Sequence, residues 1–234
     1  MNAVITGATK GIGLAVSKVF AENGINLCVC SRNEAELDSM RQSFQTEYPD
    51  LSFYSQACDV SQKSEVLNFA NYCTEVFEGK IDVLVNNAGI YIGGEIENEE
   101  DGALEQMIDT NLYSAYHLTR AILPNMISQK DGHVINMCSI ASQIAYPNGG
   151  SYSISKFALL GFTKVLREEM KEKGIRVTAI LPGATWSNSW AVVELPRERL
   201  MEAYDIAQVV YTAVKLGKSA VMEDVVIRPQ LGDL

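Results

Sequence analysis

Short apolar runs alternate along the chain with longer segments in which apolar residues recur every three or four positions. A short apolar run is typical of a buried strand, and the spaced pattern is typical of an amphipathic helix. The runs at 81–85 and 134–137 are almost wholly apolar, as expected for parallel strands that are covered on both faces. Strands are predicted at 1–6, 25–31, 51–58, 81–86, 132–138, 175–181 and 224–228, and helices at roughly 11–23, 33–48, 62–78, 99–111, 113–130, 151–174 and 204–217.

This alternation predicts an α/β fold, a doubly wound parallel sheet of about seven strands with helices on both faces. Asn33 followed by Glu36 is typical of a helix start, and Gly174 is typical of a helix end. At 234 residues the chain has room for one large domain, so 1–234 is predicted to be a single domain. The long irregular stretch at about 183–203, which contains Trp186 and Trp190, is predicted to be a substrate loop.

Composition and charge narrow the class of protein. Hydrophobic residues make up 47% of the chain and charged residues 21%, which is normal for a globular protein with a sizeable core. The net charge of −10 argues against nucleic acid or an anionic membrane as a partner, because both attract basic surfaces. No apolar run approaches the roughly 18 residues that span a bilayer, and the first residues lack the pattern of a signal peptide. A cytoplasmic location is therefore expected.

The five cysteines form no C-x-x-C pair, and most of them lie in apolar segments. Buried, reduced thiols are expected rather than disulfides or a metal site. The acidic run at 95–101 holds five acids in seven residues. It is interpreted as a solvated loop and helix start, because acids favour the N-terminus of a helix.

The first predicted strand runs directly into a glycine-rich turn, T-G-A-T-K-G-I-G at 6–13, and a helix begins near Ile12. Glycines at 7, 11 and 13 let a pyrophosphate approach the backbone, and the helix N-terminus faces its negative charge. The motif indicates a dinucleotide site, although a glycine-rich tight turn with no ligand would have the same composition.

Tyr152 and Lys156 lie four residues apart at the start of a long predicted helix, so they share one face. A phenol loses its proton only near pH 10, and an adjacent ammonium favours the phenolate. Such a pair can exchange a proton with a carbonyl or an alcohol. Ser139, at the end of the fifth predicted strand, can hold the substrate oxygen, and Ser142 is the competing serine.

Together with N-N-A-G at 86–89 and Asn111, these motifs make nearly the whole chain resemble the single-domain short-chain dehydrogenase/reductase family. The resemblance implies that Ser139, Tyr152 and Lys156 are catalytic, and that Asn111 holds a water that links Lys156 to solvent. It also implies that Asp59 and Val60 contact adenine. The cofactor-binding residues expected on these grounds are Gly7, Thr9, Lys10, Gly11, Ile12, Gly13, Ser31, Arg32, Asp59, Val60, Asn86, Ala88, Gly89, Tyr152, Lys156, Pro182 and Gly183.

The end of the second predicted strand indicates which nicotinamide cofactor is used. An enzyme that prefers NAD(H) would place an acid there, about 20 residues beyond the glycines, to hold the ribose hydroxyls. Here the position holds Ser31, followed by Arg32, and Lys10 lies in the glycine loop. Two cations without a carboxylate suit a 2′-phosphate, so NADP(H) is expected. The nearest acids, Glu34 and Glu36, are interpreted as belonging to the helix start.

The predicted activity is the reversible, NADPH-dependent reduction of a ketone or aldehyde by hydride transfer, with Tyr152 as the proton donor. The small-molecule substrate is not readable, although Gln143, Tyr146, Trp186 and Trp190 indicate a mostly apolar or aromatic pocket. One alternative is an NADP(H)-binding sensor or regulatory protein without turnover. Another is a sugar-nucleotide epimerase or dehydratase, which shares Tyr-x-x-x-Lys.

The resemblance also implies assembly. Helices at about 111–130 and 151–174 would pair with their copies across a two-fold axis, giving a homodimer or a homotetramer. These segments carry more apolar residues than one sheet-facing stripe requires, and the alternative is that all of them face the core. The apolar positions in question are Leu112, Tyr116, Phe157, Leu160, Phe162 and Leu166.

Overall fold

The structure is a computed structural model that describes residues 1–186 and 196–232. Seven strands form one parallel sheet with the order β3-β2-β1-β4-β5-β6-β7. Consecutive strands first extend to one side of β1 and then, from β4 onward, to the other, as in a Rossmann-type sheet. This confirms the predicted fold class. The strands are β1 (Asn2–Thr6), β2 (Asn26–Ser31), β3 (Phe53–Ala57), β4 (Val83–Asn86), β5 (Gly132–Met137), β6 (Ile175–Pro182) and β7 (Asp224–Ile227).

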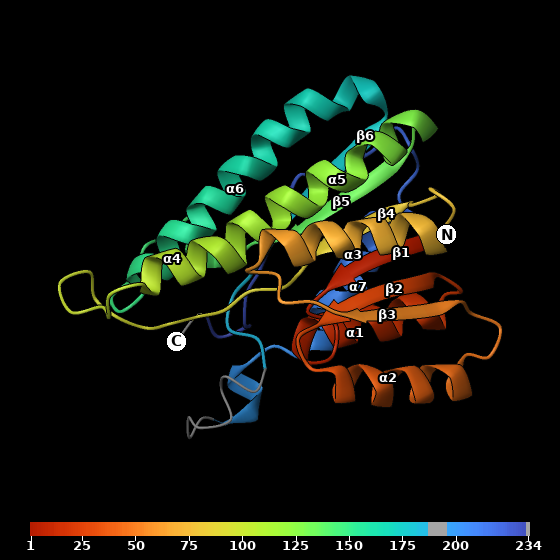
Figure 1. The fold of residues 1–234 in the computed structure, drawn as a ribbon. Coiled ribbons are helices and arrows are strands. Elements are labelled where there is room, and N and C mark those ends of the chain that lie inside the picture. Colours follow the sequence, from red (N-terminus) through yellow and green to blue (C-terminus); the bar gives the residue numbers. More distant parts are fainter. Residues whose placement is uncertain (187–195, 233–234) are drawn as a thin grey trace.

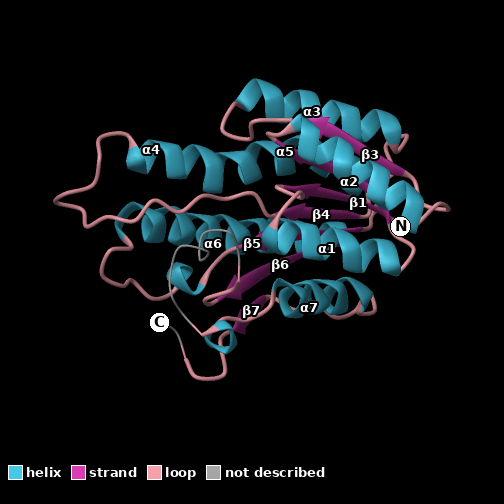
Figure 2. Cartoon of the chain, turned by 90° about the horizontal axis from the view of Figure 1, so that it is seen from below, coloured by secondary structure: helices cyan, strands magenta, loops and turns pink. Residues whose placement is uncertain are grey.

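Helices cover both faces of the sheet (Figures 1 and 2). One face carries α1, α2 and α7, and the other carries α3, α4, α5 and α6. The crossover from each strand to the next passes through a helix, which is how parallel neighbours are connected. The helices are α1 (Gly11–Glu22), α2 (Glu34–Glu47), α3 (Lys63–Val76), α4 (Ala103–Ile108), α5 (Ser114–Gln129), α6 (Gly150–Met170) and α7 (Ala203–Lys215).

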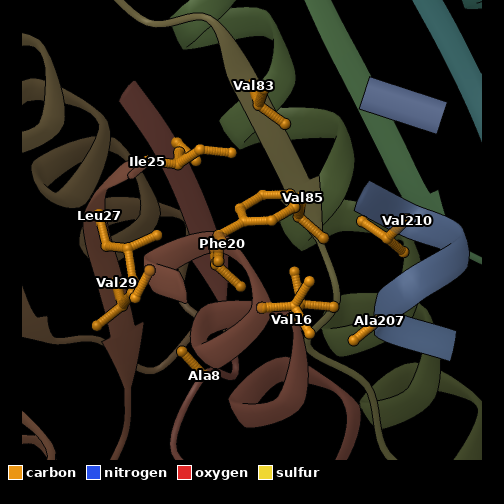
Figure 3. Close-up of a cluster of buried hydrophobic side chains, with 14 of the residues drawn as sticks. Ala8, Val16, Phe20, Ile25, Leu27, Val29, Val83, Val85, Ala207 and Val210 are labelled. Atoms are coloured by element: carbon orange, nitrogen blue, oxygen red, sulfur yellow. The ribbon is translucent and has the colours of Figure 1, made fainter. Parts of the chain in front are cut away.

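The core under α1 shows why the first strand and helix form a rigid unit (Figure 3). Val16 and Phe20 of α1 are completely buried, and they pack in the same cluster as Val29 of β2, Val85 of β4 and Val210 of α7. Full burial of one such side chain stabilises the fold by about 1.5–3 kcal/mol. The glycine turn that joins β1 to α1 is therefore held between two fixed elements.

The structure corrects one helix boundary. Two separate helices were predicted at 99–111 and 113–130, but α4 continues into α5 through a π-helical turn, Asp109–Tyr113. Such turns insert an extra residue into a helix and frequently lie at functional sites. Asn111 lies in this turn and is 1% exposed. It is thus inside a continuous helical segment rather than at a helix end.

The substrate loop predicted at about 183–203 is described only at its two ends. These ends pair with each other, because the Trp186 amide donates to the Met201 carbonyl at 2.8 Å and the Met201 amide donates to the Ala184 carbonyl at 3.0 Å. A short 3₁₀ turn, Arg197–Arg199, precedes that pairing. Trp190 lies outside the described residues.

All five cysteines are buried free thiols, as predicted. The closest pair is Cys28 on β2 and Cys73 on α3, whose sulfur atoms are 3.4 Å apart. In the part of the chain that the structure describes, no helix is long and apolar enough to cross a membrane.

Candidate functional site

The glycine turn and the Asn-Asn-Ala-Gly turn lie side by side, because β1 and β4 are neighbours in the sheet. The Thr6 hydroxyl accepts hydrogen bonds from the amides of Asn87 and Ala88, both at 3.0 Å. The Asn87 amide side chain donates to the Thr6 carbonyl at 2.9 Å and to the Gly7 carbonyl at 3.1 Å. These four bonds join the two turns into one floor at the carboxyl edge of the sheet.

Glycine is required at two positions in this floor. Gly7 has a φ of +65°, which favours glycine, and a Cβ there would lie 3.0 Å from the Ala88 backbone. A Cβ on Gly13 would lie only 2.2 Å from the Gly7 carbonyl oxygen. The turn therefore closes tightly over the start of α1, as a pyrophosphate cradle requires.

The N-terminus of α1 has the character of an anion site. Its N-cap residue, Lys10, makes no side-chain cap hydrogen bond, and the first turn of the helix, which includes Gly11 and Ile12, contains no acid. Free N–H groups and the helix dipole both favour a negatively charged ligand there. The glycine turn fits a dinucleotide on these grounds.

The structure places beside Lys10 a carboxylate that the sequence pattern assigned only to a helix start. The Lys10 ammonium is 2.6 Å from an oxygen of Glu36, which lies in the first turn of α2. The Thr9 hydroxyl donates to the other Glu36 oxygen at 2.9 Å. These contacts hold the pKa of the Glu36 carboxyl below its usual range, with Lys10 as the main cause. The helix-start role is also present, because Asn33 accepts a hydrogen bond from the Glu36 amide at 3.2 Å.

Ser31 is the last residue of β2, and Arg32 follows it, so both come directly after the residue to which the glycine turn is bonded. The Ala8 amide donates to the carbonyl of Cys30 at 3.2 Å, which fixes the turn against the end of β2. Arg32 is exposed, and the Ser31 hydroxyl accepts a long hydrogen bond from the Asn33 amide at 3.3 Å. A cation is thus presented to solvent beside the turn.

Asp59 follows β3, and one of its carboxylate oxygens is already engaged. That oxygen accepts from the Ser61 amide at 3.0 Å and from the Ser61 hydroxyl at 2.8 Å, just before α3 begins. Asp59 therefore stabilises the turn between β3 and α3. Val60, its neighbour, is 8% exposed and packs in the core.

Asn86 and Gly89 have different neighbours. The Asn86 side chain is buried and donates to Thr119 at 2.9 Å and to Asn136 at 2.8 Å, so it binds α5 and β5 rather than facing solvent. A Cβ on Gly89 would lie 3.2 Å from the Asn111 side-chain oxygen and 3.5 Å from the Lys156 ammonium. Gly89 thus gives both polar groups room beside the backbone.

Lys156 is a buried ammonium, 4% exposed, on the second turn of α6. It donates to the carbonyl of Met137, the last residue of β5, at 2.9 Å. It also lies 5.8 Å from the centre of the Tyr152 ring. Burying an ammonium is costly, so a lysine held here by one carbonyl and one phenol ring is typical of a functional position.

Ser139 lies two residues beyond that carbonyl, at the start of a 3₁₀ turn, Ile140–Ser142. Its hydroxyl oxygen accepts from the Ala141 amide at 3.1 Å, while the Ser142 hydroxyl accepts from the Ser139 amide at 3.2 Å. The two serines therefore form a reciprocal cap. Ser142 is 1% exposed and Ser139 is 9% exposed, so Ser139 is the more accessible of the two.

The Asn111 amide joins the Asn-Asn-Ala-Gly segment to α6. Its oxygen accepts from the Ile90 amide at 2.7 Å, and its nitrogen donates to the Ile90 carbonyl at 3.0 Å and to the Ser155 hydroxyl at 2.9 Å. Ser155 in turn donates to the Tyr152 carbonyl at 2.8 Å. Asn111 therefore fixes the backbone beside Tyr152 through direct bonds.

Tyr91 is a residue of the site that the sequence analysis missed. Its ring meets the ring of Tyr152 edge-on, with centroids 5.0 Å apart, and its hydroxyl donates to the Asn148 carbonyl at 3.0 Å. Desolvation raises the pKa of Tyr91, and the neighbouring Tyr152 adds to this effect. The sequence places Tyr91 directly after N-N-A-G-I, but no motif marks the tyrosine itself.

Glu99 was interpreted as part of a solvated acidic run and start of its own helix, but it caps another helix. One of its oxygens accepts from the Ser151 amide at 2.7 Å, and the other accepts from the Ser151 hydroxyl. Ser151 is in the first turn of α6, next to Tyr152. These bonds lower the pKa of the Glu99 carboxyl. The loop before α4 is thus bound to the start of α6.

Pro182 ends β6, and the Gly183 amide donates to the Ile227 carbonyl of β7 at 2.7 Å. The turn therefore leaves the sheet at the same carboxyl edge as the glycine turn and Ser139. Open parallel sheets bind ligands at this edge, where the strand order reverses. The turns that follow β1, β4, β5 and β6, which carry many of the predicted site residues, therefore lie along this one edge.

The chain matches the family model described as short chain dehydrogenase over residues 1–196. It is 30% identical to an uncharacterized oxidoreductase of Staphylococcus saprophyticus, over 97% of this chain and 96% of that protein. A metagenomic short-chain oxidoreductase solved in complex with NADP is 30% identical, with a TM-score of 0.85 and coverage of 98% and 97%. An alcohol dehydrogenase from the archaeon Thermococcus sibiricus, complexed with 5-hydroxy-NADP, is 26% identical, with a TM-score of 0.90 and coverage of 98% and 96%.

The parallel sheet, together with these relatives, places the chain among oxidoreductases of the dinucleotide-binding α/β class. The chain belongs to the short-chain dehydrogenase family.

Proposed function

We propose that this protein is an NADP(H)-dependent oxidoreductase that interconverts a ketone or aldehyde and the corresponding alcohol. The observation that carries the proposal is the buried Lys156 ammonium, held between the Met137 carbonyl at the end of β5 and the ring of Tyr152. A buried cation beside a phenol, at the edge of the sheet where ligands bind, is suited to proton transfer.

The described residues supply a partner for each charged part of the cofactor. The glycine turn and the N-terminus of α1 would hold the pyrophosphate, and Lys10 and Arg32 would hold the 2′-phosphate. Lys156 would bind the hydroxyls of the nicotinamide ribose. The solved relatives that contain NADP or 5-hydroxy-NADP support this choice of cofactor. When bound, the reduced nicotinamide supplies a hydride to the carbonyl carbon.

In the reduction, the Tyr152 hydroxyl gives its proton to the carbonyl oxygen as that oxygen becomes an alcohol. The Lys156 ammonium stabilises the phenolate that remains, because opposite charges attract strongly where water is excluded. Ser139 has an acceptor bond from the Ala141 amide, which leaves its own proton to donate to the substrate oxygen. Asn111 and Glu99 position the start of α6, which carries Tyr152.

The substrate body is proposed to be apolar or ring-shaped. Large apolar side chains are exposed on the segments that surround the site: Tyr91 is 48% exposed, Ile144 51%, Tyr146 40% and Trp186 36%. Tyr91 lies against Tyr152 itself. Exposed apolar groups that gather around a site are typical of ligand recognition.

The test is a panel of aliphatic, aromatic and alicyclic ketones and aldehydes, assayed by the loss of NADPH absorbance. The wild-type protein is expected to reduce at least one apolar member. Tyr152→Phe keeps the ring against Tyr91 but has no proton to transfer, so kcat should fall by at least about a hundredfold. NADPH binding, measured by fluorescence, should persist in the variant.

A control distinguishes loss of the proton from loss of shape. Tyr91→Phe also removes one hydroxyl, yet its ring contact with Tyr152 remains, so its kcat should stay within a fewfold of wild type. Turnover by Tyr152→Phe within a fewfold of wild type would contradict the mechanism. NADPH binding without turnover of any carbonyl compound would instead favour a sensor.

A further inference from the structure

Both oxygens of the Glu36 carboxylate are engaged beside Lys10, one of the two cations expected to bind the cofactor phosphate. One oxygen accepts from the Lys10 ammonium at 2.6 Å and from the Asn33 side-chain amide at 3.1 Å. The other accepts from the Thr9 hydroxyl at 2.9 Å. Because Thr9 and Lys10 belong to the glycine turn, these bonds connect the start of α2 to the turn itself.

The ion pair has a geometry that a bound phosphate would have to change. The Lys10 side chain is 59% exposed and that of Glu36 is 30% exposed, so the pair is open to ligands from solvent. A phosphate that binds Lys10 must share the ammonium with the carboxylate or displace it. Sharing brings two negative groups close together, and displacement breaks the ion pair of Glu36, so both are unfavourable.

A free ribose hydroxyl meets a different situation. A hydroxyl can donate a hydrogen bond to a carboxylate, so a cofactor without the 2′-phosphate does not need to disturb the Lys10 pair. Arg32, exposed at the end of β2, makes the opposite contribution and attracts the phosphate. At the adenosine end of the site, Arg32 therefore favours NADP(H), whereas Glu36 favours NAD(H).

We propose that Glu36 is a cofactor-specificity residue that opposes the 2′-phosphate by holding Lys10, so that the protein accepts NAD(H) as well as NADP(H). This inference rests on the proposed function only in requiring that a nicotinamide dinucleotide binds at the glycine turn. It changes the expectation from the sequence, in which Lys10 and Arg32 act without any opposing acid.

The experiment compares Glu36→Gln with Glu34→Gln in binding assays. Both acids lie in the first turn of α2, and Glu34 is exposed, so the two variants remove the same charge from the same helix end. Dissociation constants are measured by calorimetry for NADP⁺ and NAD⁺. Adenosine 2′,5′-bisphosphate and AMP serve as probes of the adenosine end alone.

Glu36→Gln should bind NADP⁺ and the bisphosphate about three- to tenfold more tightly than wild type, because Lys10 is released from an exposed ion pair and a repulsive charge is lost. Its affinity for NAD⁺ and AMP should be unchanged or weaker. Glu34→Gln should change the ratio of the two dinucleotide affinities by less than about twofold. Equal thermal midpoints would show that both variants are folded.

Equal effects of the two variants would overturn the inference, because they would reduce Glu36 to general surface charge. Weaker NADP⁺ binding by Glu36→Gln would also overturn it, since Glu36 would then orient Lys10 toward the phosphate. If wild type binds neither dinucleotide, both this inference and the proposed function fail. If wild type binds them but reduces no carbonyl compound, only the proposed function fails, and the affinity ratio still decides this inference.

Discussion

Ser139 and Ser142 lie three residues apart, but the structure gives their hydroxyls different tasks. Ser142 is buried, and its hydroxyl closes the 3₁₀ turn by accepting a hydrogen bond from the Ser139 amide. Within the described residues, the Ser139 hydroxyl accepts a hydrogen bond from the Ala141 amide and donates none. Its proton can therefore point toward a ligand. The two serines therefore differ in whether the hydroxyl proton is available to a substrate.

Ser139→Ala should therefore lower kcat by about ten- to a hundredfold, because one donor to the substrate oxygen is removed. Ser142→Ala should leave kcat within a fewfold and lower the free energy of unfolding by about 1 kcal/mol through the lost cap. Steady-state kinetics and urea unfolding of both variants measure these effects. A larger catalytic loss in Ser142→Ala would mean that the reactive serine has been assigned wrongly.

At the scale of elements, α6 is used on two sides. Its inner side carries Lys156, and Leu160 and Leu166 are 6% and 4% exposed within the protomer's own core. For these two leucines the alternative holds that they face the protomer's own core. Its outer side instead exposes Phe157 and Val165, which are 45% and 58% exposed. In Figure 1, α6 lies outermost on its side of the sheet, beside α5.

This outer row leads to a prediction about assembly. An exposed apolar stripe on a helix is typical of a contact surface, and a two-fold axis would pair α6 with its copy. We expect a homodimer or a homotetramer in light scattering. Val165→Glu should shift it toward smaller species, because a charge would be buried without a partner.

Leu67→Glu provides the control for that experiment. Leu67 is 38% exposed on α3, so the variant adds the same charge at an apolar surface position on a different helix. Its molar mass in solution should equal that of wild type. A wild-type protein that is a stable, fully active monomer at micromolar concentration would contradict the assembly prediction.

At the scale of the whole molecule, stability should depend on pH through one buried histidine. His133 on β5 is completely buried, and its Nε2 lies 2.7 Å from the Thr178 hydroxyl on β6. That hydroxyl donates to the Met222 carbonyl at 2.6 Å, so Nε2 must be the protonated nitrogen and donate to it. Burial, and to a lesser extent Arg176, lowers the pKa of His133 to about 3.

The unfolded chain takes up a proton on this histidine near its ordinary pKa of 6.5, whereas the folded protein does not until about pH 3. As the pH decreases from about 6.5 to about 3, the free energy of unfolding should therefore fall by about 1.4 kcal/mol per pH unit from this residue alone. His133→Gln should show a shallower dependence in urea unfolding between pH 6 and about pH 4 than wild type does. His117→Gln, on the outer part of α5, should keep most of the wild-type slope, and equal slopes in all three proteins would contradict the assignment.

Local sequence patterns were sufficient to predict the elements and the chemistry that lies within one element. Strand and helix periods are local properties, so the seven-stranded α/β fold followed from the pattern. Tyr152 and Lys156 are four residues apart, so one helix face brings them together, and the ring contact confirms that neighbourhood. Gly7 and Gly13 lie within one short motif, so the glycine-rich turn was readable for the same reason.

The contacts between groups that are distant in the sequence became visible only in the folded chain. Glu36 was readable as a helix-start acid, yet its bond to Lys10 depends on how α2 packs beside the glycine turn. Glu99 and Ser151 are 52 positions apart, and no pattern in the acidic run indicates that it caps α6. The outward direction of Val165 likewise depends on where the sheet lies. Hydrophobic periodicity reports that a residue is apolar and which face it shares, whereas its partner is set by the packing of whole elements.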